Sequence, residues 1–134
     1  MIKKICIPCL LLLIMSVATA FAAFPEIPRI SNEELKQLID AKEKVVILDT
    51  QPKEVYDTGH IKGAISFPWK EEFTLDDVAN LPKDQLIVTY CDCGPGESDS
   101  AFVANQLLQL NFTKVKVLGE PGIRGWAKSK YPME

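Results

Sequence analysis

Hydrophobic positions along the chain alternate between short apolar runs and helical repeats. The runs at 45–48, 86–90 and 115–118 are mostly apolar or β-branched, as buried parallel strands are. Apolar residues recur instead at helical spacing over 35–39 and over 101–108. Strands that alternate with helices in this way predict an α/β domain, with a central, mostly parallel five-stranded sheet flanked by helices on both faces.

Shorter elements are expected around these runs. Ser31-Asn32-Glu33-Glu34 is a capping box that should start the first long helix. Prolines and apolar spacing indicate the rest: an edge strand at the end of 24–30, a short helix opened by Pro52, an extended piece at 65–67, an amphipathic helix or two helical turns over 69–81, and a closing helical turn at 123–126.

The N-terminal segment has the layout of a secretory signal peptide. Lys3 and Lys4 precede an apolar run over 5–17, and small residues at 18–23 are spaced for cleavage after Ala22. We therefore expect residues 1–22 to be a signal peptide and residues 23–134 to be one exported domain, periplasmic or secreted. The alternative is an uncleaved membrane anchor, because the apolar stretch is almost long enough to span a bilayer.

Composition limits the classes of partner. The chain has 134 residues, 47% of them apolar, and a formal net charge of −3, which becomes more negative once Lys3 and Lys4 are removed. An acidic domain of this kind does not favour binding to nucleic acid or to an acidic membrane surface. The expected partners are small molecules and proteins, with no nucleic acid and no membrane after cleavage of the leader.

Cysteine usage changes with processing. Cys6 and Cys9 lie in the leader, so the mature domain keeps only Cys91 and Cys93, too few for a disulfide framework. In an exported protein, an exposed thiol pair is oxidised, kept reduced by a partner, or occupied with chemistry.

The candidate site lies after the strand that ends at Tyr90. Cys91 follows that strand, the Gly-Pro-Gly at 94–96 forces a turn, and Ser98 or Ser100 can cap the next helix. Ligands of parallel sheets bind beyond the carboxyl ends of the strands. The order predicts that loop N–H groups and a helix N-terminus converge on the Cys91 sulfur and favour a thiolate. The alternative is a buried structural cysteine.

Three stretches of the mature chain, in this order, resemble the rhodanese family of sulfurtransferases: Val46–Thr50 with Glu54–Ile65, then Tyr90-Cys91, then Gly122–Trp126 with Tyr131-Pro132. The resemblance covers almost the whole mature chain. It implies a small α/β domain in which Cys91 takes a sulfane sulfur as a persulfide and passes it to a thiol or protein acceptor. It implies no cofactor.

The resemblance also assigns roles around Cys91. The active-site loop would comprise Asp92, Gly94, Pro95, Gly96, Glu97, Ser98, Asp99 and Ser100. Asp49 would tie down loop N–H groups, His60 would brace a turn, and Arg124 would be either a cation for an incoming anion or half of a surface ion pair. No metal is expected, because zinc needs more ligands than two cysteines and one histidine, unless Asp49 or water joins them.

The loop departs from the family pattern. It is a few residues longer and places Asp99 where the family has an arginine, and Gln51 stands where many relatives carry another. Residues 91–100 include Asp92, Glu97 and Asp99 but no lysine or arginine. A dianion such as thiosulfate should be repelled there, and nearby negative charge should raise the pKa of the Cys91 thiol. The resemblance therefore favours a donor other than free thiosulfate.

Cys93 leaves several functions open. It could be a loop residue without a role, could resolve a Cys91 persulfide, or could form a strained and easily reduced C-x-C disulfide. The leading hypothesis is a sulfurtransferase. The alternatives are a thiol redox protein that uses the Cys91/Cys93 pair and a binding module that kept the fold without turnover.

Overall fold

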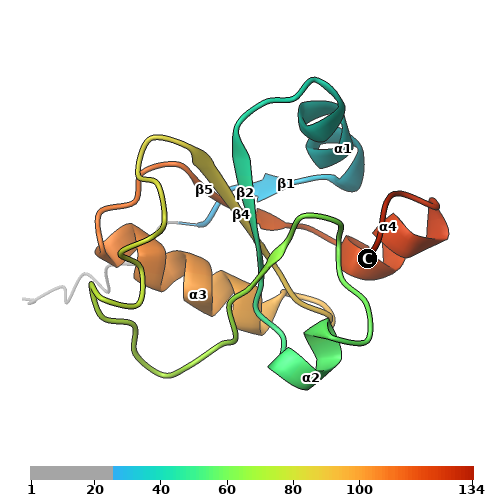
Figure 1. The fold of residues 1–134 in the computed structure, drawn as a ribbon. Helices are drawn as coiled ribbons and strands as arrows, with labels where there is room; N and C mark the ends of the chain where they lie inside the picture. Colours follow the sequence, from blue (N-terminus) through green and yellow to red (C-terminus); the bar gives the residue numbers. More distant parts are fainter. Residues whose placement is uncertain (1–25) are drawn as a thin grey trace, which may run out of the picture.

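Five parallel strands form the centre of the fold in a computed structural model that describes residues 26–134 (Figure 1). The signal peptide and cleavage site predicted at 1–22 lie outside the described residues. In sequence order the strands are β1 (Arg29–Ile30), β2 (Val45–Asp49), β3 (Ile65–Ser66), β4 (Leu86–Tyr90) and β5 (Val115–Leu118). They are arranged β1-β5-β4-β2-β3, and every neighbouring pair is parallel. The predicted fold class is confirmed.

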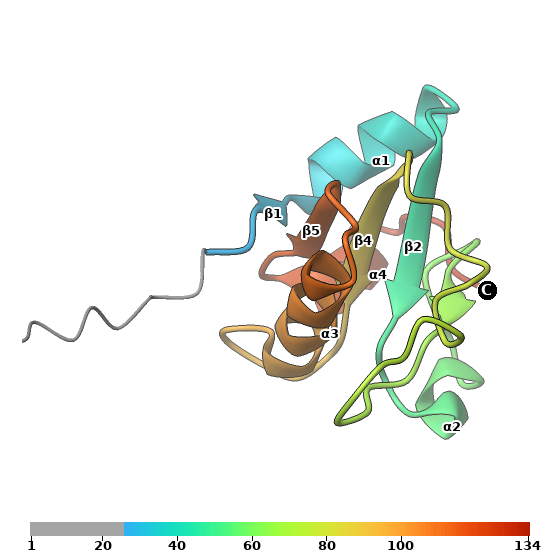
Figure 2. The same ribbon diagram turned by 90° about the vertical axis from the view of Figure 1, so that its left-hand side faces the viewer.

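Helices cover both faces of this sheet (Figure 2). The four helices are α1 (Asn32–Asp40), α2 (Lys53–Tyr56), α3 (Ser98–Gln109) and α4 (Gly122–Lys128). The longest, α3, packs on β4 and β5, whereas α1 and α4 contact each other on the opposite face. None of these helices, which are the ones described in 26–134, is long and apolar enough to cross a membrane.

Successive strand residues serve the two faces alternately. In β2, Ile47 packs in the cluster that contains Trp126 of α4, and Leu48 packs in the cluster under α3. In β4, Val88 and Ile87 divide in the same way. Because both faces are covered, the longer strands consist mostly of apolar residues, which is the pattern that predicted them.

The helix α1 begins as the capping box predicts. The Ser31 hydroxyl accepts a hydrogen bond from the Glu34 N–H at 3.1 Å, and the Ser31 N–H donates to the Glu34 carboxylate at 2.9 Å. These two bonds to Ser31 lower the pKa of Glu34. Leu35, on the apolar side of the helix, is fully buried.

The continuous helix predicted over 69–81 is not formed, whereas the alternative of two turns agrees with the bonds from the Ala79 N–H to the Asp76 carbonyl and from the Leu81 N–H to the Val78 carbonyl. This segment crosses the α3 side of the sheet as irregular chain followed by turns at 75–80. Gln106 of α3 accepts a hydrogen bond from the Phe73 N–H at 2.7 Å and donates to the Lys70 carbonyl at 3.1 Å. These contacts use the backbone groups with which a helix would have to begin. Phe73 and Val78 are buried, as their apolar character indicates, but Leu75 is exposed.

Candidate active site

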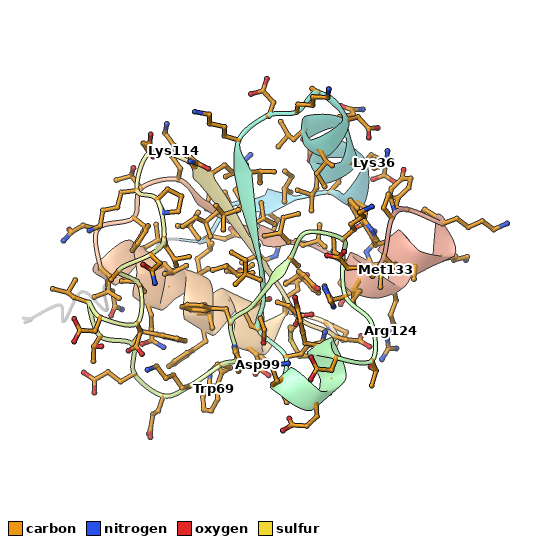
Figure 3. All side chains as sticks on the ribbon, in the orientation of Figure 1. Lys36, Trp69, Asp99, Lys114, Arg124 and Met133 are labelled. Carbon is orange, nitrogen blue, oxygen red and sulfur yellow. A yellow bond between two sulfur atoms is a disulfide. The ribbon has the colours of Figure 1, made fainter. Side chains whose placement is uncertain are left out.

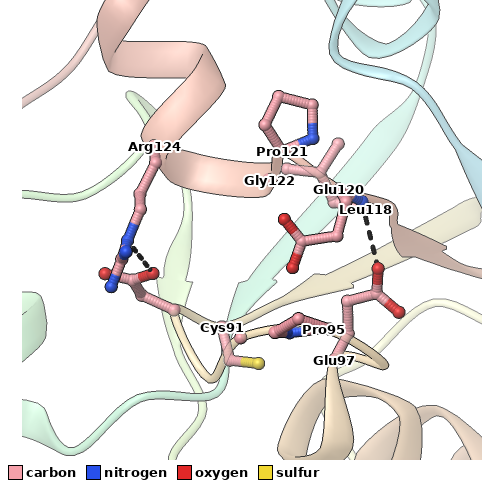
Figure 4. Close-up of a pocket in the computed structure, with 10 residues that line it drawn as sticks. Cys91, Pro95, Glu97, Leu118, Glu120, Pro121, Gly122 and Arg124 are labelled. Carbon is pink, nitrogen blue, oxygen red and sulfur yellow. Dashed lines mark hydrogen bonds and ion pairs between the residues drawn. The ribbon is translucent and has the colours of Figure 1, made fainter.

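A pocket of about 110 Å³ opens at the carboxyl edge of the sheet, with Cys91 at its base (Figure 4). One wall is the loop that follows β4, and the other is the connection from β5 to α4. The loop runs through residues 91–97, and the opposite wall comprises residues 118–124. The site therefore lies where a parallel sheet places its ligands, and its small volume suits a substrate group of only a few atoms.

Cys91 is nearly buried, with 8% of its surface exposed, and it is joined to Cys93 by a disulfide across a Cα–Cα distance of 5.4 Å. Its sulfur lies 3.5 Å from the Ser100 hydroxyl. Among residues 26–134, no main-chain N–H of the loop donates to this sulfur, so the predicted cradle of N–H groups is absent from the disulfide form. The Cys93 sulfur lies instead beside the Cys91 sulfur.

The start of α3 also differs from the prediction. Neither Ser98 nor Ser100 caps the helix; Glu97 holds the N-cap position in a left-handed conformation, with φ of 46°, and makes no side-chain cap. The Ser100 hydroxyl donates to the Glu97 carbonyl at 3.1 Å. Gly94 and Gly96, with φ of 80° and 89°, allow the tight turn predicted between Cys91 and the helix.

A partly buried ion pair holds the end of this loop. The Glu97 carboxylate, which is almost fully buried, lies 3.0 Å from the Arg29 guanidinium of β1 and also accepts a hydrogen bond from the Glu120 N–H at 3.0 Å. The sequence interpretation missed this contact. A buried acid in a loop needs a cation as partner. Because the chain has only two arginines, Arg29 and Arg124, the sequence did offer a short list of candidates for this pairing.

Replacement of Arg29 by alanine should destabilise the fold by about 1–3 kcal/mol, because Glu97 would remain as a buried charge without its partner. Chemical denaturation of the reduced protein measures this loss. Lys53→Ala is the matched control, because Lys53 and Asp57 form a solvent-exposed ion pair. This substitution should change stability by less than about 0.5 kcal/mol. Equal losses in the two variants would show that the Arg29 pair does not hold the loop.

A second ion pair spans the mouth of the pocket. The Arg124 guanidinium of α4 lies 2.6 Å from the Asp92 carboxylate, and the Arg124 side chain is 76% exposed (Figure 4). Arg124 thus lines the pocket, as a cation for an incoming anion would, but it is already paired. The surface ion pair that was one interpretation of Arg124 is therefore present, and its role as a cation for an incoming anion stays a prediction.

Carboxylates dominate the rest of the pocket lining. Asp92, Glu97 and Glu120 line it, and Figure 4 shows the Glu120 carboxylate on the pocket side between Arg124 and Glu97. Asp99, which the sequence also places in the acidic loop, lies instead beside Trp69 in a separate hollow (Figure 3). The acidity predicted for the site is therefore present, but Glu120 rather than Asp99 contributes to it.

Asp49 connects the ends of two neighbouring strands. Its carboxylate accepts a hydrogen bond from the Gln51 N–H at 2.9 Å, as predicted, and one from the Tyr90 hydroxyl at 2.6 Å, which was not. The Tyr90 hydroxyl in turn accepts from the Ile61 N–H at 3.1 Å. Burial first, and the bond to Asp49 second, raise the pKa of Tyr90 above its usual value. The residue preceding Cys91 is thereby fixed in place.

His60 braces a turn away from the pocket. Its Nδ1 atom lies 3.0 Å from the Tyr56 carbonyl oxygen, and its ring stacks on the Tyr56 ring with centroids 3.7 Å apart. The His60 N–H also donates to the carbonyl of Glu134 at 2.8 Å. Within residues 26–134, no three histidine, cysteine or acidic side chains meet in an arrangement that could hold a metal ion.

Comparisons with known proteins agree with this architecture. The family model of the rhodanese-like domain matches residues 31–129. YrkF of Bacillus subtilis, provisionally described as a sulfur carrier protein, is 34% identical over 75% of this chain. UBA4 of Candida albicans, an adenylyltransferase and sulfurtransferase, is 26% identical over 74% of it. The chain spans 51% and 23% of the lengths of these two relatives.

A solved structure has the same fold over most of both chains. The BH2092 protein of Bacillus halodurans superposes with a TM-score of 0.70 at 30% identity, covering 80% of this chain and 76% of that one. The family match includes the segment that carries Cys91 and the wall opposite it.

Proposed function

The chain belongs to the rhodanese-like domain family, and on this premise we propose that it is a sulfurtransferase that carries sulfane sulfur as a persulfide on Cys91. The observation that supports this most directly is the position of Cys91, at the end of β4 and at the base of the small pocket. The relatives described as a sulfur carrier and a sulfurtransferase support the same class of reaction.

The transfer would proceed by two displacements at sulfur. The disulfide to Cys93 is first reduced by a dithiol. The Cys91 thiolate then attacks the sulfane sulfur of a donor, a new S–S bond forms, and the rest of the donor leaves as a thiolate with the bonding electron pair. An acceptor nucleophile next attacks the outer sulfur of the persulfide, and the Cys91 thiolate leaves in turn.

The charge of the pocket favours a donor other than free thiosulfate. Three carboxylates line this pocket. Asp92 is paired with Arg124 and Glu97 with Arg29, so Glu120 is the lining carboxylate that makes no ion pair among the described residues. A dianion would be repelled, whereas a persulfide group on a small thiol or on a protein brings at most one negative charge. We propose that the donor belongs to this second class.

Mass spectrometry of the reduced and desalted protein tests the proposal. After incubation with a small-thiol persulfide, the peptide that contains Cys91 should gain about 32 Da, the mass of one sulfur atom, in the Cys93→Ser variant, which lacks the second thiol of the loop. The gain should disappear when an acceptor thiol is added. Absence of this adduct on the reduced variant, across several sulfane-sulfur donors, would contradict the proposed function.

Release of Arg124 should improve the use of anionic donors. Asp92→Asn removes the ion-pair partner of Arg124 and one negative charge at the mouth of the pocket. An interaction change of about 1 kcal/mol is expected at this distance, so kcat/KM for thiosulfate should rise severalfold, and less at high salt. Asp99→Asn is the control, because Asp99 lies in the separate hollow beside Trp69, and kcat/KM should stay unchanged. Equal effects of the two substitutions would contradict the explanation.

The disulfide favours a second candidate function, thiol redox exchange. Cys91 and Cys93 are bonded in the structure, as a dithiol couple would be in its oxidised state. Titration of thiols separates the two functions. A redox protein alternates between a form with two free thiols and a form with none, and it does so in the absence of a sulfane-sulfur donor.

The N-terminal pattern supports export as a further proposal. Ala23 is the expected first residue of the mature protein, and N-terminal sequencing of the exported protein would test this. A full-length chain retained in the membrane fraction would favour the uncleaved anchor.

A further inference from the structure

We propose that Cys93 resolves the Cys91 persulfide, so that the domain releases its sulfur as hydrosulfide and is left with the Cys91–Cys93 disulfide. This inference rests on the proposed sulfurtransferase function and adds a second activity to it. The structure holds the protein in the state that this reaction would produce. A dithiol, such as a protein with a C-x-x-C pair, would then have to reduce the disulfide before the next cycle.

The position of Cys93 determines which sulfur it attacks. In the disulfide, its sulfur is bonded to the sulfur that Cys91 itself carries, which would be the inner sulfur of a persulfide. Among the described residues, Cys91 lines the pocket and Cys93 does not. The outer sulfur can therefore leave on the pocket side while Cys93 approaches from the loop side, which is the opposed arrangement that displacement at sulfur requires.

The loop keeps Cys93 close to its target. Only Asp92 separates the two cysteines, and ion pairs hold the loop on both sides of Cys93, from Asp92 to Arg124 and from Glu97 to Arg29. A nucleophile tethered in this way competes well with nucleophiles from solution, because its effective concentration is high.

The charge of the pocket acts in the same direction. A persulfide is anionic near neutral pH, and its outer sulfur would share the pocket with the Glu120 carboxylate, which makes no ion pair among the described residues. Repulsion from this group opposes storage of the anion and favours its departure. The site is thus better suited to discharge a bound sulfur than to retain it.

The proposed step balances in atoms and electrons. The Cys93 thiol gives up its proton and attacks the inner sulfur as a thiolate. The S–S bond to the outer sulfur breaks, and the outer sulfur leaves with the bonding pair and takes up that proton, as hydrosulfide. The two cysteines together lose two electrons, and the sulfane sulfur gains them. Reduction by the dithiol returns two electrons and two protons to the cysteines.

A single turnover without reductant tests the inference. Wild-type protein, reduced and desalted, receives one equivalent of a small-thiol persulfide. We expect release of about one equivalent of sulfide and a protein mass lower by about 2 Da, the two thiol hydrogens. Cys93→Ser should instead keep the adduct of about 32 Da and release no sulfide. Lys53→Ala, at an exposed ion pair in α2 outside the pocket, should behave as the wild type does.

The outcomes distinguish this inference from the proposed function. If neither protein ever gains sulfur, the proposed function fails. If both proteins gain sulfur and the wild type keeps it without releasing sulfide, the proposed role of Cys93 is wrong but the proposed function stands. If Cys93→Ser releases sulfide at the wild-type rate, the role of Cys93 is also wrong. The reverse reaction needs no variant: sulfide added to the oxidised wild type should give the adduct on Cys91 and one free thiol on Cys93.

Discussion

Substitution of Cys91 by serine should abolish the uptake of sulfane sulfur. A hydroxyl is a far weaker nucleophile toward sulfur than a thiolate, and among residues 26–134 no other cysteine lines the pocket. Transfer should fall by about 10³-fold or more, to the rate of the reaction in solution. Sulfur transfer from a small-thiol persulfide to an acceptor thiol, followed under multiple-turnover conditions, measures the loss.

Cys93→Ser is the matched control for this experiment. It removes the other thiol of the loop and should keep uptake, since Cys91 remains free to attack the donor. Retention of sulfur uptake by Cys91→Ser would move the nucleophile to Cys93. Full biological activity of Cys91→Ser in the cell, in contrast, would support the binding-module alternative, in which the fold serves without turnover.

Replacement of Tyr90 by phenylalanine should cost about 2–4 kcal/mol of stability at neutral pH. The variant keeps the ring but removes the hydroxyl that donates to Asp49 and accepts from the Ile61 N–H. A buried carboxylate and a buried N–H would each lose a partner. Chemical denaturation of the two proteins gives the difference. Tyr131→Phe is the control. It keeps the ring that packs edge-on against Trp126, so its stability should be close to that of the wild type.

The same substitution predicts a difference at alkaline pH. Because burial raises the pKa of Tyr90 in the folded protein, the unfolded chain loses this proton first, near pH 10. Above pH 10 the folded state therefore loses about 1.4 kcal/mol per pH unit through Tyr90, and the stability advantage of the wild type over Tyr90→Phe should narrow. An advantage that stayed constant from pH 8 to about pH 11 would contradict the assignment of this hydroxyl as buried and protonated.

The sheet could be predicted because its strands are buried on both faces. The apolar runs that become β2, β4 and β5 need no knowledge of distant contacts, and the capping box of α1 is a local signal. The continuous helix over 69–81 was wrongly predicted for the opposite reason. The Phe73 N–H and the Lys70 carbonyl bond to the side chain of Gln106, more than thirty positions away, and no local pattern reveals such a partner.

The candidate site could likewise be predicted only in part. The position of Cys91 and the acidity of its loop follow from the order of residues. The identity of the acids that line the pocket cannot be predicted from this order, because Glu120 comes from the opposite wall and Asp99 lies in a separate hollow. The pairing of Glu97 with Arg29 joins residues 68 positions apart, so it depends on the parallel contact of β1 with β5 rather than on spacing.

The two-residue strand β1 also sets a boundary for experiments on this domain. The family match begins at residue 31, just beyond Arg29. A protein trimmed to the matched span would lack both β1 and the guanidinium that neutralises Glu97, although every residue of the pocket wall would still be present. The activity measured on such a shortened protein would be that of a loop without its ion pair. A protein made for activity assays should therefore begin at least a few residues before Arg29.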